Sequence, residues 1–411
     1  MFKIVRFPRK LETFFHSLSD QFHWEHFEYF RMLVLLMAFA WGRRTITNLY
    51  RHLDDSTHSH RTRFNNFFNV GRWDPEEFLA FKAHELLRIL KPKKGEVAEL
   101  IIDSSNKQKK GKRMEAVGWI YDPVSGRKYK GHTYVKAAIR FRNYTIPLGI
   151  RLYVKAELCG ALGMEFKKLT HLAAELIETC SPPEGLKVYA LFDIYYLCPV
   201  VVNACKRKGF HFIAPVKSNR NLFKNGRKLK AGKYAKNLFR RSTKQAFTLK
   251  KQDRTKQFQY VDAGWMEVSS LGSLHLIVSR RKGERTGISL VTDDKKLTPK
   301  KMIEFYDDRW NIEVFFRDAK QLLGFGQYQN STYRAAVTHL HLVCFAYALL
   351  THIAIEGESA QGKTKQSKIP STADLQNELR RIVWEDFSKQ VRKLPDGKKI
   401  FRELDRLFIA A

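Results

Sequence analysis

The order of apolar and polar residues divides the chain into a helical first part and a mixed second part. Over residues 1–95, apolar residues recur at the three- and four-residue spacing of amphipathic helices. This spacing predicts a helical domain. Its main helices are expected at residues 27–41, 45–53, 60–70 and 74–90.

The helices expected at residues 45–53 and 60–70 are joined by a short polar stretch, which is the spacing of a helix-turn-helix. The second of them carries Arg61, Arg63 and Asn65, whose side chains suit phosphates and base edges. This favours a DNA-binding role. The alternative is an ordinary helical bundle with a solvated basic face.

From residue 96 the pattern changes to strands and helices in alternation. Apolar strands are expected at 97–103, 132–141, 144–154, 187–193 and 210–216, with helices at 165–180 and 195–208. This order predicts a mixed α/β sheet with helices on its faces. Two strands deliver an aspartate, Asp103 and Asp193, at their C-terminal ends, where loops build sites in open sheets.

The next segment is dense in basic residues. Between Lys217 and Lys256 fifteen lysines and arginines stand against one acid, and aromatic residues are interleaved with them. Such a run is usually a solvated face, but this density with aromatic residues favours nucleic-acid contact. Three β-rich runs follow, so we expect residues 217–296 to form a basic β-rich insertion.

The most distinctive helical pattern lies at residues 306–320. At about 100° per residue, a helix here places four reactive side chains within an arc of roughly 60°. They are Tyr306, Arg309, Glu313 and Lys320. An apolar stripe beside them would pack on a core. The simplest interpretation is an amphipathic helix with an i, i+4 salt bridge between Arg309 and Glu313.

The remaining segments complete the domain organisation. Residues 297–356 are expected to hold this helix and a long apolar core helix, and residues 357–411 a linker and a helical C-terminal region. The linker satisfies the P-loop pattern G-x-x-x-x-G-K-[ST] at residues 357–364. A P-loop follows a strand and opens a helix, whereas here a helix precedes the pattern, so we reject nucleotide binding.

Composition narrows the class of partner. The 411 residues include 74 Lys and Arg against 41 Asp and Glu, a formal charge of +33. An excess of this size indicates a polyanionic partner, with nucleic acid as the first candidate. No run is apolar for long enough to predict a membrane span, and no export signal is visible. The five scattered cysteines fit reduced thiols in a cytosol.

Asp103, Asp193 and Glu313 together suggest a particular chemistry. Two strand-borne aspartates and a helical acid are what a two-metal site needs, because paired Mg²⁺ ions require oxygen ligands that leave room for phosphate oxygens and water. Strands often end in Asp for turn reasons, so the aspartates alone are weak evidence. Their combination with the helix at residues 306–320 is stronger.

These residues resemble the DDE transposases of the insertion-sequence-4 group. That group carries Asp, Asp and Glu on an RNase H-like core, with the spacing Y-x2-R-x3-E-x6-K around the glutamate. Here Tyr306, Arg309, Glu313 and Lys320 fit this spacing without a gap. A β-rich insertion before the glutamate helix is also a feature of the group. The resemblance covers residues 100–350, and the termini only by general layout.

The resemblance implies a fold and a function. The expected fold is α/β, an RNase H-like mixed sheet with a β-rich insertion, flanked by helical terminal regions, the first of which binds DNA ends. Asp103, Asp193 and Glu313 would be catalytic and hold Mg²⁺, with Mn²⁺ as a substitute. Tyr306, Arg309 and Lys320 would grip phosphates, and Trp265 would stack on a flipped base, unless it belongs to the core of the insertion.

The implied protein is the transposase of a bacterial insertion sequence. It would bind double-stranded DNA, both the terminal inverted repeats and the target. It would cut and join strands as a homodimer in a synaptic complex. Its expected location is the bacterial cytoplasm, associated with the nucleoid and not with a membrane. Two alternatives stay open. One is a transposase-derived DNA-binding protein without catalysis, and the other a metal-dependent nuclease that cuts DNA but does not join it.

Overall fold

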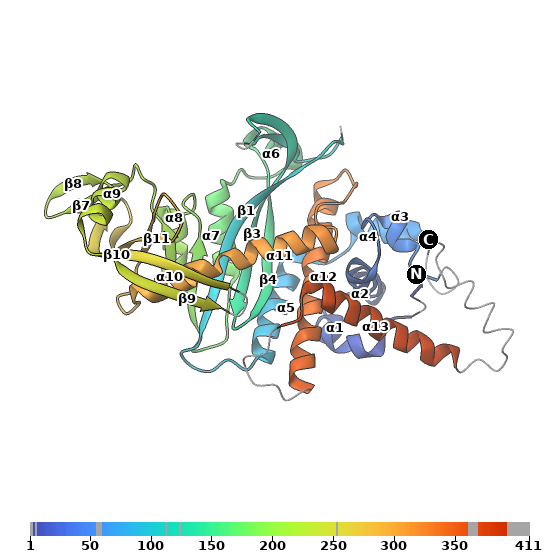
Figure 1. Cartoon of the computed structure of the whole chain (residues 1–411). Coiled ribbons are helices and arrows are strands. Elements are labelled where there is room, and N and C mark those ends of the chain that lie inside the picture. The colour runs from blue at the N-terminus through green and yellow to red at the C-terminus, as the bar shows by residue number, and fades with distance from the viewer. Residues whose placement is uncertain are drawn as a thin grey trace. The chain divides into compact units, whose positions relative to one another are not determined.

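The chain folds into two compact units, each built from segments far apart in the sequence. The computed structural model describes residues 3–4, 6–54, 60–111, 113–122, 125–251, 254–360 and 369–392. Unit 1 consists of Met1–Leu86, Asn106–His132 and Phe315–Ala411, and unit 2 of Leu87–Ser105 and Thr133–Val314. Figure 1 traces the course of the chain by residue number.

Unit 1 is mainly helical. Its described helices are η1 (Arg9–Leu11), α1 (Glu12–Ser19), α2 (Trp24–Phe39), α3 (Ile46–Tyr50), α4 (Arg61–Val70), α12 (Tyr333–Ala360) and α13 (Thr372–Val391), while α5 (Pro75–Ile89) runs on into unit 2. The four helices predicted for the N-terminal region are thus present. α2 lies at the centre, because every residue from Met32 to Phe39 is buried and α12, α4 and α13 pack against it.

Helix α12 is the long apolar helix expected within residues 297–356. Among the described residues it alone has the length and apolar composition of a membrane span, so the expectation that no run is apolar for long enough was wrong. However, 83% of that stretch is buried inside the structure. This burial is what a core helix requires. α12 also includes Gly357, the first residue of the P-loop pattern, whose residues 361–364 lie outside the described part of the chain.

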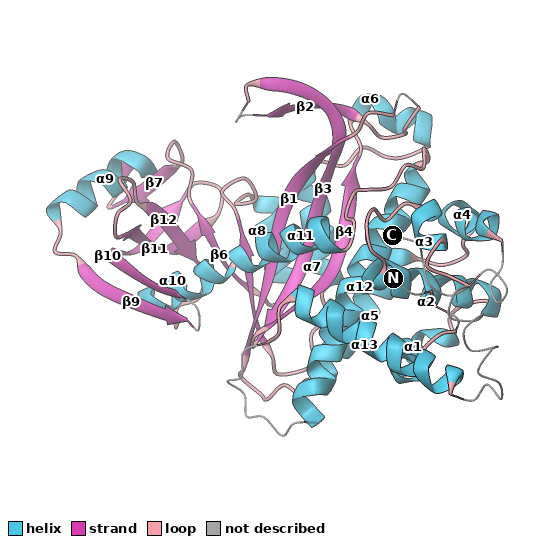
Figure 2. Ribbon diagram, turned by 45° about the vertical axis from the view of Figure 1, so that its right-hand side comes forward, coloured by secondary structure: helices cyan, strands magenta, loops and turns pink. Residues whose placement is uncertain are grey.

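The strands of the described residues form one mixed sheet (Figure 2). They are β1 (Val97–Gln108), β2 (Gly118–Asp122), β3 (Arg127–Phe141), β4 (Tyr144–Tyr153), β5 (Lys187–Phe192), β6 (His211–Pro215), β7 (Asn221–Lys224), β8 (Arg227–Lys230), β9 (Gln245–Lys251), β10 (Arg254–Val268), β11 (Gly272–Arg281) and β12 (Ile288–Thr292). Their order is β2-β3-β1-β5-β6-β12-β11-β10-β7-β8, with β4 on β3 and β9 on β10.

The core of unit 2 uses five of these strands, in the order β4, β3, β1, β5 and β6. β1, β5 and β6 run parallel, whereas β3 and β4 form an antiparallel hairpin. α7 (Leu169–Thr179) packs on β4, and α8 (Pro199–Arg207) on β6. The short turns α6 (Ala156–Cys159) and η2 (Gly160–Leu162) precede α7. This strand order confirms the predicted RNase H-like α/β fold with a β-rich insertion.

The insertion continues the sheet beyond β6. β12 pairs with β6 in antiparallel fashion, and β11, β10 and β7 follow in turn. The insertion also contains α9 (Ala231–Arg241), which the sequence did not predict. Its apolar residues Ala231, Tyr234, Ala235 and Leu238 recur at helical spacing, but they lie within the run of lysines and arginines, where only the charge and the aromatic residues entered the prediction.

The continuous helix predicted at residues 306–320 is wrong in one respect. It is divided into α10 (Pro299–Asp308) and α11 (Trp310–Leu322), with Arg309 between them. The N–H of Arg309 donates to the carbonyl of Tyr306, three residues back, at 3.2 Å. This tight turn is typical of the end of an α-helix. The apolar stripe is as expected, with Ile312, Phe316 and Leu323 buried.

Candidate active site

Asp103 and Asp193 lie side by side at the edge of the core sheet. β1 and β5 are parallel, and the last pair in register is Ile102 with Phe192. The two aspartates come directly after this pair. Asp193 follows the end of β5, whereas β1 continues to Gln108, so the prediction that Asp103 ends its strand is wrong. Because adjacent strands are about 4.8 Å apart, the sheet brings both carboxylates to one place. The sequence-based pairing of these residues is therefore supported by the strand register.

The surroundings of the two aspartates differ. Lys136, which is buried on β3, approaches Asp103 with Nζ 3.2 Å from Oδ2. Asp193 accepts a hydrogen bond from the N–H of Tyr195 at 2.8 Å. Burial raises the pKa of Asp193, and the negative charge of Asp103 raises it further, although the hydrogen bond opposes both. Sequence reasoning missed Lys136, because a lysine on an apolar strand gives no signal of its partner.

Arg309 connects Asp103 with Glu313. Its Nη2 donates to Glu313 Oε1 at 2.9 Å, and its Nη1 lies 4.0 Å from Asp103 Oδ1. The predicted i, i+4 salt bridge is thus present, within a larger arrangement. Burial alone would lower the pKa of Arg309, but Tyr306, Asp103 and Glu313 hold it above its usual value. The guanidinium therefore stays charged between the two acids.

Tyr306 and Lys320, the other two reactive side chains predicted on this helix, differ in position. Burial raises the pKa of Tyr306 to about 12, and its hydroxyl interacts with Arg309, so it belongs to the same cluster. Lys320 is seven residues beyond Glu313 on α11, past the boundary where unit 1 resumes at Phe315. Unit 2 therefore gathers Asp103, Asp193, Tyr306, Arg309 and Glu313 without Lys320.

A buried charge network supports the turn that carries Arg309. Arg140 places Nη1 2.9 Å from Glu99 Oε2 and 3.2 Å from Asp308 Oδ2, and Lys251 Nζ lies 2.6 Å from Asp308 Oδ1. Both acids are 4% exposed. Burial and the charge of Asp308 raise the pKa of Glu99 to about 8. Because Asp308 immediately precedes Arg309, this network fixes the place where α10 gives way to α11.

A groove of about 1080 Å³ is lined by Asp193 and by residues of α9 and β11. Its lining includes five cations: Lys236, Arg240, Lys244, Arg280 and Arg285. Within the described residues none of the five is in a salt bridge with an acid. The ring of Phe239 lies between two of them, 4.8 Å from the Arg280 guanidinium carbon and 5.6 Å from Lys244 Nζ. The basic run predicted such a surface, whereas its approach to Asp193 depends on the fold.

Trp265 lies on β10 in the insertion and is 40% exposed. One face of its ring stacks on His275, the cross-strand neighbour on β11, at 5.7 Å between centroids. The alternative that Trp265 is buried in the core of the insertion is therefore wrong. Its proposed stacking on a flipped base stays a prediction.

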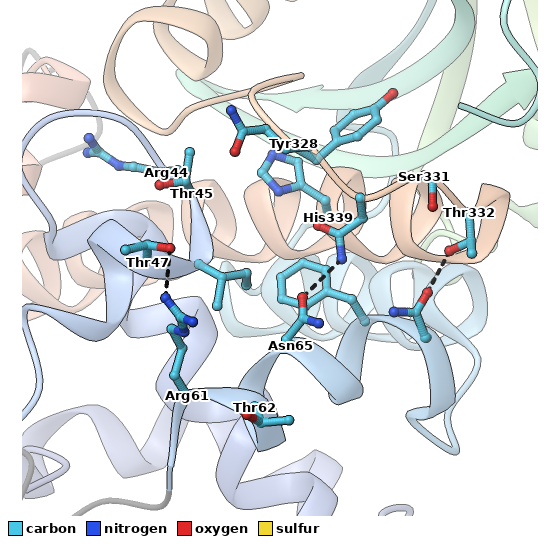
Figure 3. Close-up of a pocket in the computed structure, with 15 residues that line it drawn as sticks. Arg44, Thr45, Thr47, Arg61, Thr62, Asn65, Tyr328, Ser331, Thr332 and His339 are labelled. Carbon is cyan, nitrogen blue, oxygen red and sulfur yellow. Dashed lines mark hydrogen bonds between the residues drawn. The ribbon is translucent and has the colours of Figure 1, made fainter. Parts of the chain in front are cut away.

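The N-terminal candidates divide between two places. Arg61 and Asn65 line a cavity of about 610 Å³ in unit 1, formed by α4, the start of α3 and the loop before α12 (Figure 3). Arg61 Nη1 donates to Thr47 Oγ1 at 3.3 Å, and Asn330 Nδ2 donates to Asn65 Oδ1 at 3.4 Å. Arg63 does not line the cavity. It is exposed and hydrogen-bonded to Tyr29, which raises the pKa of the guanidinium.

The fold and the acidic cluster define a class of protein. Asp103 lies within β1, and Asp193 follows β5 directly. Paired aspartates on neighbouring parallel strands, beside a glutamate-bearing helix, form an RNase H-like site suited to phosphoryl transfer on nucleic acid. The chain belongs to the DDE superfamily endonuclease family, whose model matches residues 13–267. The matched part contains Asp103 and Asp193 and ends before Glu313.

The chain was also compared with curated proteins and with solved structures. No curated protein matches the sequence. Among solved structures the chain is similar to one described as the "Cryo-EM structure of piggyBac transposase synaptic complex with hairpin DNA". The identity is 11%, the TM-score is 0.48, and the match covers 98% of this chain and 82% of that one.

Proposed function

We propose that this protein is the DNA transposase of a bacterial insertion sequence of the insertion-sequence-4 type. It would bind terminal inverted repeats, cut the DNA strand at the ends of the element and join it to target DNA. It would act in the cytoplasm as a homodimer in a synaptic complex. One observation carries this proposal: Arg309 holds Glu313 beside Asp103, next to Asp193, in a chain of the DDE endonuclease family.

The donor set suits the metal that the family implies. Asp103, Asp193 and Glu313 offer carboxylate oxygens, the ligands that Mg²⁺ and Mn²⁺ prefer. Within the described residues no three acidic, histidine or cysteine side chains are already close enough to hold an ion. The guanidinium of Arg309 lies between two of the three acids, since it bonds Glu313 and faces Asp103. A Mg²⁺ ion held by the three acids would supply activation of water and neutralise charge on the phosphate.

The chain's own residues have separate tasks in this proposal. Arg309, released from Glu313, would bind a non-bridging phosphate oxygen, since guanidinium forms two parallel hydrogen bonds to such groups. Tyr306 keeps its proton because its pKa is raised to about 12, so it would donate to the same phosphate. Lys136 stays beside Asp103 and holds that carboxylate in its rotamer. Lys320 would contact the DNA backbone farther along α11.

The cationic groove gives the DNA a path to this cluster. Five positive side chains line it together with Asp193, and none of the five is in a salt bridge within the described part of the chain. Phosphates of a DNA strand would follow these side chains and release counterions as they bind. Trp265, also in the insertion, would stack on an unpaired base near the cut. In unit 1, the cavity lined by Arg61 and Asn65 would contact the terminal repeat, with Arg63 on the outer face of α4.

The test is cleavage of labelled DNA that carries the ends of the element, with Mg²⁺ and with EDTA. We compare the wild type with Glu313→Gln and with Glu304→Gln, a matched change on α10 whose carboxylate pairs with Lys301. We expect metal-dependent cutting and joining by the wild type and Glu304→Gln, and neither by Glu313→Gln, which should still bind the ends.

The outcomes separate the three interpretations. If the wild type binds the ends but cuts nothing, the chain is a DNA-binding relative without catalysis. If it cuts but never joins the freed 3′ end to a target, it is a nuclease. Full activity in Glu313→Gln would exclude Glu313 as the third metal ligand.

A further inference from the structure

An exposed aromatic pair lies on the β2–β3 hairpin of unit 1. Trp119 is 56% exposed and Tyr121 is 59% exposed, although both belong to a regular strand. Residues two apart on a strand point to the same face. The two rings therefore share one face, and β2 is the terminal strand in the order of the described sheet. Neither the carboxylate site nor the groove uses this face.

Lysines alternate with the two rings across the hairpin. The cross-strand partner of Trp119 is Lys130, and that of Tyr121 is Lys128. Directly opposite residues in an antiparallel pair lie on the same side of the sheet. Lys130 Nζ is 5.4 Å from the centroid of the Trp119 ring. We call these four residues the aromatic–lysine face.

The hairpin holds this face in a fixed position. Gly131, at the inner end of the pairing, lies so close to β1 that a Cβ would be 2.5 Å from the carbonyl of Lys107. The N–H of Lys109 donates to the carbonyl of Lys130 at 2.9 Å. Ile120, between the two exposed rings, points the other way and comes within 3.1 Å of the Cβ position of Gly131. The backbone under the two lysines is therefore anchored to β1.

The charge of the hairpin favours one kind of partner. Its described acids are already engaged: Asp122 accepts from the hydroxyl of Ser125 at 2.7 Å, and Glu115 accepts from the N–H of Tyr333. Lys128 and Lys130 are exposed and are in no salt bridge within the described residues. Flat apolar rings with adjacent cations match a partner that has flat apolar faces joined by phosphates.

We propose that the aromatic–lysine face binds unpaired nucleotides of a DNA strand. Two bases stack on Trp119 and Tyr121, while Lys128 and Lys130 contact the phosphates. The two rings arise from positions about 6.8 Å apart along β2, which is twice the roughly 3.4 Å step of stacked nucleotides. The face therefore fits alternate bases of one strand. This proposal rests on the proposed function only because it assumes that the polyanionic partner is DNA.

The test measures binding of a labelled oligothymidylate and of a labelled duplex by fluorescence anisotropy, without metal and at fixed salt. Because Trp119 and Tyr121 are exposed, Trp119→Ala and Tyr121→Ala should leave the fold intact, which circular dichroism checks. We expect each to weaken single-strand binding about tenfold and duplex binding hardly at all. The matched control is Trp24→Ala, a 69% exposed tryptophan elsewhere in unit 1, which should change neither.

The lysines have their own readout. Lys128→Ala and Lys130→Ala should each lower the slope of log affinity against log salt for the single strand by about 0.7. Equal losses for single strand and duplex would overturn the proposal in favour of a general phosphate contact. Unchanged DNA binding with altered binding to anionic vesicles, or with an altered oligomeric state, would assign the face to a membrane or to a second copy. Because no cleavage is involved, failure here leaves the transposase proposal intact.

Discussion

Replacement of Arg140 by methionine tests the buried network behind Arg309. Arg140 is the shared partner of Glu99 and Asp308, with contacts of 2.9 Å and 3.2 Å. At this separation each attraction is about 5 kcal/mol for an effective dielectric constant of 20, and much of it offsets the desolvation of the charges. Without Arg140, Glu99 and Asp308 still bear the desolvation free energy of burial, and only the positive charge of Lys251 remains to offset it. We expect the free energy of unfolding to fall by about 3–5 kcal/mol.

The loss should depend on pH with a definite sign. The pKa of Glu99 is raised from its ordinary 4.5 to about 8 in the folded state. The folded protein therefore binds this proton more tightly than the unfolded chain, and stability falls as the pH rises between these values. Removal of Arg140 raises the pKa further. The penalty should accordingly be largest at about pH 9 and shrink toward about pH 5.

Urea unfolding at both pH values gives the measurement. The control is Arg207→Met on α8, which breaks an exposed pair with Glu178 and should cost at most about 1 kcal/mol at either pH. A loss in Arg140→Met as small as in this control, or equal at the two pH values, would refute the idea that Arg140 neutralises two buried acids.

Two further predictions concern other parts of the chain. Gly324 has φ +75°, and a Cβ there would be 2.5 Å from Cβ of Arg44. Gly324→Ala should therefore lower the free energy of unfolding in urea by roughly 1–3 kcal/mol. Gly357→Ala, at a position on α12 with open space around it, should not lower it. Lys236→Ala combined with Arg240→Ala should make the salt dependence of duplex binding less steep by about two units, and Lys206→Ala on α8 should leave it unchanged. An unchanged slope in the double variant would exclude the groove as a DNA path.

The core of the fold was predictable because its signals are local. The first half of β1 and the whole of β5 and β6 are nearly uninterrupted apolar runs, as strands covered on both faces must be. Each of the apolar runs in β1 and β5 is followed by an aspartate, and this predicted a shared site on neighbouring parallel strands before any contact was known. Glu313 and Arg309 came from helical spacing, and their salt bridge has the expected partner and distance.

What escaped prediction depends on contacts between distant residues. Lys136 and Arg140 lie on one apolar strand, and nothing near them in the sequence shows that they face Asp103 and Glu99. β2 has only five residues and takes its register from β3. The break at Arg309 comes directly after Asp308, which is bound by Arg140 and Lys251, and a helical wheel does not contain such contacts.

The packing of α12 on α2 has a consequence for the order in which the protein folds. The two helices belong to one compact unit but are separated by about three hundred residues of chain. Synthesis proceeds from the N-terminus, so the apolar surface of α2 leaves the ribosome long before its partner exists. Closing so long a loop is also slow. Unit 1 therefore completes its core late, and during synthesis the apolar surface of α2 stays exposed to aggregation until α12 has emerged.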